Sequence, residues 1–363
     1  MRGKIERLGP TTMSVLIVAL LLNGSAAFAQ PTLQPADSSL IRMASAMVES
    51  TAEVARVWPG FWSDDQTFLL LRPTETALLI TSRTPPSEYK AVPESQLPEE
   101  LIGRVYLRKE YPPGIDENTF DTRYQVGRDT IPALEPKRST LFGQSDFYMH
   151  EAFHGHQRAN WVETPGDTMR AKPGRPLVEP SHVESLEFRA QGEVERHILD
   201  SALDVSSQDR LLALMHRYLA VRRMRTNGLD DVNAVERSME RREGTAQYVG
   251  CYSASGVANV PEKRALSCIQ EELTTPLDSM RNFPEADARL MRWRQYGTGG
   301  ALSVILNRLD AENWQERVSE GAALDEILSK VIGYDSKQHS SLARQALESF
   351  NYAKLLQEAD DED

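Results

Sequence analysis

The residues best suited to chemistry are two histidines and a glutamate in the segment His150-Glu151-Ala152-Phe153-His154. No proline occurs from Leu141 to Thr164, so the segment can lie on one helix. On a helix, His150 and His154 are about 40° apart on one face, and their ring nitrogens can converge on one Zn²⁺. Glu151 lies beside that face, where it could take a proton from a metal-bound water. The spacing predicts a zinc site with His150 and His154 as ligands and Glu151 as general base. The alternative is a helix whose two histidines bind no metal.

Glu243 is the predicted third ligand, because catalytic zinc usually has three protein ligands and one open position. It begins the segment Glu243-Gly244-Thr245-Ala246-Gln247-Tyr248, inside a predicted helix over 232–255. The small Gly244 and Ala246 would let this helix approach the histidine helix closely. Its rivals are three glutamates on another predicted helix, over 184–203: Glu187, Glu193 and Glu195.

These two motifs, in this order, resemble the gluzincin zinc metallopeptidases, in which the H-E-x-x-H helix precedes a helix that carries a glutamate ligand in E-G-x-A-x-Y. A further likeness is Tyr296-Gly297-Thr298-Gly299, which begins 53 residues after Glu243. The resemblance implies that Tyr296 donates a hydrogen bond to the oxyanion of the tetrahedral intermediate, with Tyr248 as the second candidate. The alternative for Tyr296 is a tyrosine packed at a helix start.

The resemblance covers roughly residues 140–335 and has further implications. Glu243 follows His154 by 89 residues, so an insertion with predicted helices over 184–203 and 209–225 must be accommodated. Gln247 would accept a hydrogen bond from a ligand imidazole. Helix geometry, independently of the resemblance, predicts that Gln157 lies on the metal-binding face and lines the site, and that His156 lies on the far side of the helix. The amine-binding G-x-M-E-N segment of gluzincin aminopeptidases does not occur, so exopeptidase activity is not assigned.

The function that the resemblance implies is that of a zinc metallopeptidase acting on a peptide or protein substrate. Zn²⁺ on His150, His154 and Glu243 would lower the pKa of its bound water toward about 7, and Glu151 would take the proton. Two alternatives remain open at this point. One is a peptidase-like binding protein without catalysis, and the other is a zinc hydrolase of a non-peptide amide or ester.

The elements around these residues predict an α+β fold. A helix is expected over 38–57, followed by short strands over 67–71, 77–81, 103–107 and 122–126. Past residue 140 nearly every segment has the helical period, including 146–158, 184–203, 209–225, 232–255 and 301–309, apart from an irregular loop over 166–180. We therefore expect a small strand-containing section, residues 30–139, followed by a mainly helical, zincin-like section, residues 140–363.

Residues 1–29 are predicted to be a signal peptide, since basic residues precede a short apolar run and Ala27-Phe28-Ala29 suits cleavage. Export to the periplasm or the medium follows, with no stable membrane anchor afterwards. The chain has 41 basic and 53 acidic side chains, a net charge of −12, which argues against nucleic acid as a partner. The two cysteines, Cys251 and Cys268, could form a disulfide in an oxidising compartment or remain buried thiols.

Overall fold

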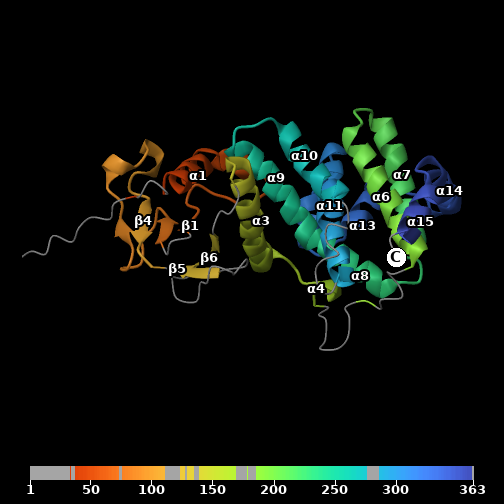
Figure 1. Ribbon diagram of the computed structural model, residues 1–363, viewed down its shortest axis with the longest axis horizontal. Helices are drawn as coiled ribbons and strands as arrows, with labels where there is room; N and C mark the ends of the chain where they lie inside the picture. The colour runs from red at the N-terminus through yellow and green to blue at the C-terminus, as the bar shows by residue number, and fades with distance from the viewer. Residues whose placement is uncertain are drawn as a thin grey trace, which may run out of the picture.

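The computed structural model describes residues 37–72, 76–110, 123–126, 129–134, 139–168, 185–275 and 286–361, together with Leu33 and Val178. The predicted signal peptide and most of the predicted 166–180 loop lie outside these residues. Figure 1 shows the strands at one end of an elongated molecule and a group of helices at the other end. Strands in the described residues fall between Phe68 and Leu134, and helices dominate from Leu141 onward. This confirms the predicted α+β class.

The sheet has six described strands in the order β3-β4-β2-β1-β6-β5. They are β1 (Phe68–Arg72), β2 (Thr76–Ile80), β3 (Lys90–Ala91), β4 (Val105–Arg108), β5 (Arg123–Val126) and β6 (Asp129–Leu134). The four predicted strands correspond to β1, β2, β4 and β5, whereas β3 and β6 were not predicted. Among the described pairings, β1 and β6 run parallel and the rest are antiparallel.

Both faces of the central strands are buried. Leu70 of β1 pairs with Leu78 of β2, and both face the main hydrophobic core. Leu69 and Leu79 pair on the opposite face and belong to a second, smaller core. Because side chains alternate between the faces, a strand buried on both sides reads as a continuous apolar run, as β1 and β2 do.

The predicted helix over 38–57 is two helices, α1 (Ser38–Glu49) and α2 (Thr51–Val57). The break is at Ser50, whose hydroxyl donates to the carbonyl of Gly256, a residue distant in sequence. Met43, Met47 and Val54 are fully buried in the main core. Both helices contact α9 (Thr245–Val257) of the helical section, and α1 also contacts α3 (Leu141–Asn160). The main core therefore crosses the predicted division at 139–140.

Helix α3 carries the H-E-x-x-H segment and packs along the length of α9 (Figure 1). Thr140 caps its N-terminus by accepting a hydrogen bond from the backbone N–H of Gly143. The remaining helical elements are α4 (Pro165–Thr168), α6 (Leu186–Asp204), α7 (Gln208–Arg225), α8 (Asp230–Met239), η4 (Glu240–Gly244), α10 (Glu262–Thr274), α11 (Ala286–Arg308), α12 (Trp314–Ser319), α13 (Leu324–Val331), α14 (His339–Ser349) and α15 (Tyr352–Asp361), with short 3₁₀ turns η2 (Glu94–Gln96), η3 (Glu99–Leu101) and η6 (Ser336–Gln338).

Aromatic side chains hold the centre of the core together. Trp58, which follows α2, contacts Phe153 of α3 at a centroid distance of 4.9 Å and Trp314 of α12 at 5.4 Å. Such edge-to-face contacts fix the orientation of α3 relative to its neighbours. Within the described part of the chain, every helix is too short or too polar to cross a membrane.

Candidate metal centre

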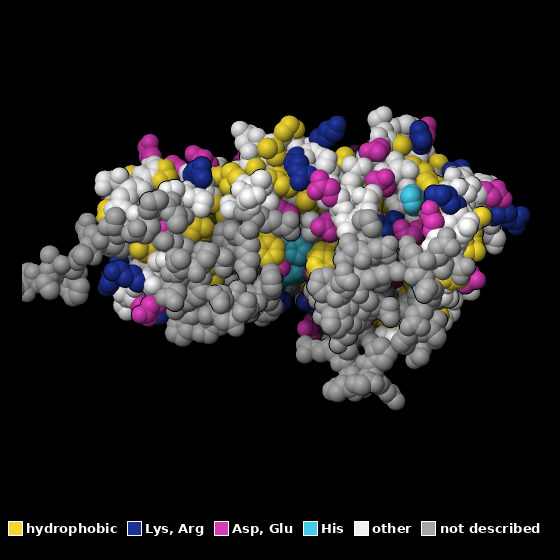
Figure 2. Space-filling model, in the orientation of Figure 1, with side chains coloured by type: hydrophobic (Ala, Val, Ile, Leu, Met, Phe, Trp, Pro, Cys, Tyr) yellow, Lys and Arg dark blue, Asp and Glu magenta, His cyan; other side chains and the backbone are white. Residues whose placement is uncertain are grey.

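The structure brings His150 and His154 of α3 together with Glu243 of η4 in one buried group that could hold a metal ion. The Nε2 atoms of the two histidines are 3.2 Å apart. Glu243 Oε2 lies 3.1 Å from Nε2 of His154 and 3.6 Å from Nε2 of His150. All three side chains are buried, and Figure 2 shows histidine surface near the middle of the molecule with hydrophobic side chains beside it.

These separations fit one tetrahedral metal ion. Two ligand atoms at about 2.0–2.1 Å from zinc, at the tetrahedral angle, are about 3.3–3.4 Å apart. The three observed separations, 3.1, 3.2 and 3.6 Å, lie around that value. Two imidazole nitrogens and one carboxylate oxygen are also a donor set that zinc accepts. The residues present therefore fit a bound divalent ion.

Electrostatics favours a charged Glu243 in this group. Burial alone would raise the pKa of Glu243, but the neighbouring imidazoles of His150 and His154 hold it well below its usual range. Burial likewise disfavours a charged His150, yet the carboxylates of Glu243, Glu151 and Asp146 raise its pKa overall. Glu243 is therefore an anionic oxygen donor at neutral pH. Glu151 lies close enough to His150 for its charge to be felt there.

Glu243 sits on a single π-helical turn, η4, where the sequence predicted an unbroken helix over 232–255. Such turns usually need tertiary contacts to persist and often occur at functional sites. Each of the five residues of η4 has a distinct contact. They are Glu240 with Arg222, Arg241 with Asp167, the Arg242 carbonyl with Gln157, Glu243 with the histidines, and Gly244 with Gly299 of α11.

The glycine contacts correct the expectation that Gly244 lets its helix approach the histidine helix. A Cβ on Gly244 would instead meet Gly299 of α11, 2.8 Å from its carbonyl carbon. The close approach to α3 is at Gly250, where a Cβ would lie 2.8 Å from the carbonyl oxygen of Asp146 and 3.2 Å from Cβ of His150. Glu243 is thus placed between α11 on one side and α3 on the other.

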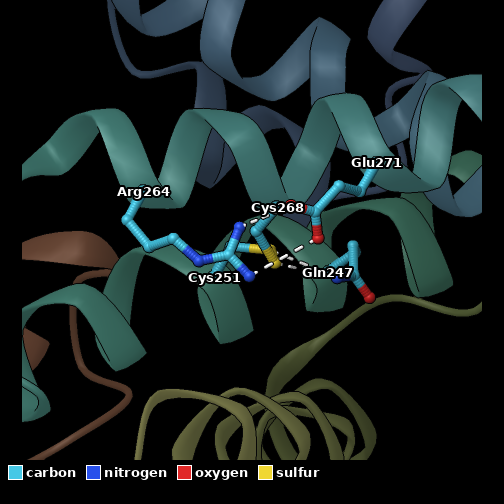
Figure 3. The surroundings of a disulfide bond; sticks show 5 residues. All are labelled: Gln247, Cys251, Arg264, Cys268 and Glu271. Atoms are coloured by element: carbon cyan, nitrogen blue, oxygen red, sulfur yellow. Dashed lines mark hydrogen bonds and ion pairs between the residues drawn. A yellow bond between two sulfur atoms is a disulfide. The ribbon is translucent and has the colours of Figure 1, made fainter.

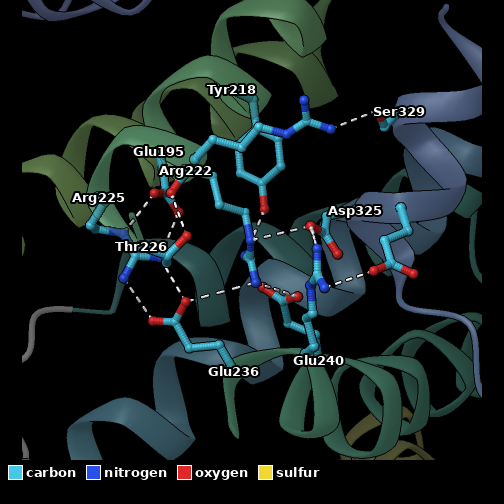
Figure 4. A network of polar contacts seen from close by, with 12 residues as sticks. Glu195, Tyr218, Arg222, Arg225, Thr226, Glu236, Glu240, Asp325 and Ser329 are labelled. Atoms are coloured by element: carbon cyan, nitrogen blue, oxygen red, sulfur yellow. Dashed lines mark hydrogen bonds and ion pairs between the residues drawn. The ribbon is translucent and has the colours of Figure 1, made fainter. Parts of the chain in front are cut away.

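A buried ionic network supports the other side of η4 (Figure 4). Arg222 of α7 donates to both carboxylate oxygens of Glu240. Three residues along the same helix, Arg225 bonds Glu195 at 2.6 Å and Glu236 at 2.7 Å. These side chains are nearly inaccessible to solvent, so removing one partner would leave an uncompensated buried charge. The predicted insertion between His154 and Glu243 therefore carries the arginines that hold the ligand segment.

The rival glutamates have other partners. Glu195 bonds Arg225, and Glu193 bonds Arg196 and Arg294. Glu187 lies near Tyr352 of α15, whose pKa its charge raises. Within the described residues, the metal-compatible group around the histidines includes Glu243 and none of these three.

Tyr296 lies at the site, and Tyr248 does not. The Tyr296 ring stacks on His150 with centroids 5.4 Å apart and planes at 4°. Trp293, one turn earlier on α11, stacks on Tyr296 at 5.1 Å and is 40% exposed. Tyr248 packs instead against Tyr252 and Trp314.

Gln157, not Gln247, contacts a ligand imidazole. Gln157 Oε1 lies 2.7 Å from Nδ1 of His154, whereas the amide nitrogen of Gln247 points at the sulfur atoms of Cys251 and Cys268. The signal that could have found this contact is local, since a residue three after His154 shares its helix face. His156, as expected, faces away and packs against Phe61 and Phe153, where burial lowers its pKa to about 4.

Cys251 of α9 and Cys268 of α10 form a disulfide, which decides between the two expectations for these residues (Figure 3). Asp146 lies near their sulfur atoms, but sulfurs joined in a disulfide are not metal ligands. The bridge joins α10 to the helix that continues from the Glu243 segment. Figure 3 also shows Arg264 and Glu271 of α10, which form an exposed ion pair.

Comparison with protein families, with curated proteins and with solved structures finds no match to this chain. The resemblance to gluzincins therefore rests on the three short sequence motifs.

Proposed function

We propose that this protein is a zinc-dependent hydrolase, of the metallopeptidase type, whose metal is held by His150, His154 and Glu243. The observation that carries the proposal is the mutual spacing of the three donor atoms, 3.1–3.6 Å, in a buried group. When bound there, zinc would polarise a substrate carbonyl and lower the pKa of a coordinated water toward about 7.

The residues around the metal ligands have matching roles in this proposal. Glu151 takes a proton from the attacking water and passes it to the leaving amine, since its carboxylate follows a ligand directly in sequence and acts electrostatically on His150. Tyr296 donates a hydrogen bond from its hydroxyl to the substrate oxygen that gains negative charge. This role is supported by the stacking of the Tyr296 ring on the ring of His150, one of the proposed ligands.

A peptide or protein is the proposed substrate class, because the H-E-x-x-H and E-G-x-A-x-Y motifs resemble those of peptidases. The same groups would act on another amide or an ester, since they address the carbonyl and not the leaving group. Export, with loss of residues 1–29, belongs to the same proposal. A binding protein without catalysis is the competing function, and the presence of Glu151 beside both histidines disfavours it.

The first test is zinc content, measured by elemental analysis of the purified chain after reconstitution. We expect about one zinc per wild-type chain and none in a His150→Ala/His154→Ala variant. His339→Ala is the control, because His339 contacts Tyr334 at a distance from the site. Absence of zinc in the wild type would contradict the proposal and favour the binding protein.

The second test separates binding from catalysis. Glu151→Gln should keep its zinc and lose about 10²–10⁴-fold in the rate of cleavage of a peptide library. Glu243→Gln should lose zinc affinity, whereas Glu193→Gln should lose stability through Arg196 and Arg294 and keep its affinity for zinc. If Glu193→Gln lost zinc and Glu243→Gln did not, the third ligand would be assigned wrongly.

A further inference from the structure

Gln157 joins the two elements that supply the metal ligands. It lies on α3, one turn after His154, and only 4% of its surface is exposed. Its Oε1 atom is 2.7 Å from His154 Nδ1, and its Nε2 atom donates to the carbonyl of Arg242 at 2.7 Å and to Oγ1 of Thr245 at 3.0 Å. Arg242 and Thr245 flank Glu243. One amide therefore contacts the ring of one proposed ligand and the residues on either side of another.

The backbone decides which way this amide points. A carbonyl oxygen only accepts hydrogen bonds, so the atom of Gln157 facing Arg242 must be the NH₂ group. The hydroxyl of Thr245 donates to the carbonyl of Arg241 at 2.5 Å, so it too presents a lone pair to Gln157. The carbonyl oxygen of Gln157 is thereby turned toward His154. Since that oxygen can only accept, Nδ1 of His154 must carry a proton.

The other ring nitrogen of His154, Nε2, has a neighbour that would attract the ring proton. Its Nε2 atom faces the carboxylate of Glu243 at 3.1 Å, and a carboxylate attracts an N–H group. If the neutral ring placed its proton there, the nitrogen would have no lone pair for a metal. The hydrogen bond to Gln157 keeps the proton on Nδ1 and thus counteracts the attraction of the proton to Nε2 by the Glu243 carboxylate.

We infer that Gln157 is the positioning residue of this centre: it holds the ring proton of His154 on Nδ1, so that Nε2 is presented for metal binding, and it ties that ring to the segment carrying Glu243. The consequence for metal affinity rests on the proposed function. The location of the proton does not, because it follows from hydrogen bonds among groups of the chain itself.

Gln247 provides a matched control. It is also a buried glutamine in the same core, 6% exposed, but its amide nitrogen contacts the disulfide sulfurs instead of a ligand. Gln157→Leu and Gln247→Leu both remove a buried amide of the same size. If Gln157 had a purely structural role, the two variants should have the same zinc affinity and the same ¹⁵N shifts of the histidine side chains.

The test measures ¹⁵N shifts of the histidine side chains and zinc affinity by chelator competition. In the wild type without zinc, we expect Nδ1 of His154 to be protonated. In Gln157→Leu this proton should move to Nε2, and zinc affinity should fall about 10–100-fold, whereas Gln247→Leu should change neither. Gln157→Glu keeps an acceptor for His154 and loses the donor to Arg242, so it should retain the protonated Nδ1 at a lower melting temperature.

Several results would overturn the inference. An unprotonated Nδ1 of His154 in the wild type would do so without any variant, even if Gln157→Leu failed to fold. Equal zinc affinities for Gln157→Leu and Gln247→Leu, with unchanged ¹⁵N shifts, would assign Gln157 to packing alone. A wild type that binds no zinc but has the protonated Nδ1 would refute the proposed function and leave the positioning of the ring by Gln157 intact.

Discussion

Gly244 and Gly299 meet backbone to backbone, and no other residue type fits either position without movement. A Cβ on Gly244 would lie 2.8 Å from the carbonyl carbon of Gly299 and 2.9 Å from the carbonyl oxygen of Gln295. The neighbours are main-chain atoms of α11, which cannot rotate away. Gly244→Ala should therefore lower the free energy of unfolding by about 1–3 kcal/mol and shift Glu243, reducing zinc affinity. Denaturant unfolding and chelator competition measure the two effects.

Gly155 is the control for this variant. It follows His154 on α3, and no neighbouring atom lies within 4 Å of the position that its Cβ would take. Gly155→Ala should stabilise the protein by about 0.5–1 kcal/mol, because alanine favours the helix, and should leave zinc affinity unchanged. If Gly244→Ala were as stable as Gly155→Ala, the close approach of η4 and α11 would not be what holds Glu243 in place.

The hydroxyl of Tyr296 can be removed without removing the ring that stacks on His150. Tyr296→Phe should keep zinc affinity, because the stacking at 5.4 Å involves only the ring, and should lower kcat by about 10²–10³-fold through loss of an oxyanion donor. Tyr248→Phe, which alters a tyrosine packed against Tyr252 and Trp314, should leave kcat unchanged. Steady-state kinetics on one peptide measures both variants. If Tyr248→Phe lowered kcat and Tyr296→Phe did not, Tyr248 would be the oxyanion donor.

What the sequence predicts well here is what depends on local spacing. The helical arrangement of His150 and His154 follows from four residues of separation, and the two central strands follow from their apolar runs. A motif predicts Glu243 as the third ligand, and the structure brings Glu243 to the two histidines. The sequence predicts a mainly helical section over 140–363 but does not delimit α10 or α12 to α15 within it.

What the sequence does not predict depends on contacts between distant segments. The π-helical turn at Glu240–Gly244 forms against Arg222, Asp167, Gln157 and Gly299, none of them adjacent in sequence. Strand β6 contains Pro132, which argues against a strand, yet β1 pairs only with the two residues beyond it, Ala133 and Leu134. Ser50 interrupts the first helix while its hydroxyl bonds the far end of α9.

The disulfide is expected to contribute stability and not metal binding. Closing a loop with a sequence separation of 17 residues should stabilise by about 3 kcal/mol on the chain-entropy model. A Cys251→Ala/Cys268→Ala variant should lose about that amount in denaturant unfolding. Zinc affinity should change less than twofold, since the ligands come from α3 and η4. A large loss of zinc would mean that the bridge also positions Glu243.

Asp167 gives the stability a defined dependence on pH. Burial alone would raise its pKa, but hydrogen bonds from Ser238 and Thr164 and the charge of Arg241, 2.6 Å away, hold it below its ordinary value of about 4. A carboxyl with a lowered folded-state pKa stabilises the fold above its unfolded-state pKa, and this contribution is lost as pH falls through the folded-state value. Asp167→Asn should thus cost about 3 kcal/mol at pH 7, where Arg241 is left without its buried partner, and the difference from wild type should shrink below about pH 4.

Asp65→Asn is the control, because Asp65 pairs with Arg83 on the surface, where salt screens the interaction. Unfolding curves from pH 3 to 7 measure both variants. If Asp167→Asn and Asp65→Asn lost the same free energy of unfolding, and salt reduced both losses, the Asp167–Arg241 pair would not be a buried support for the Glu243 segment.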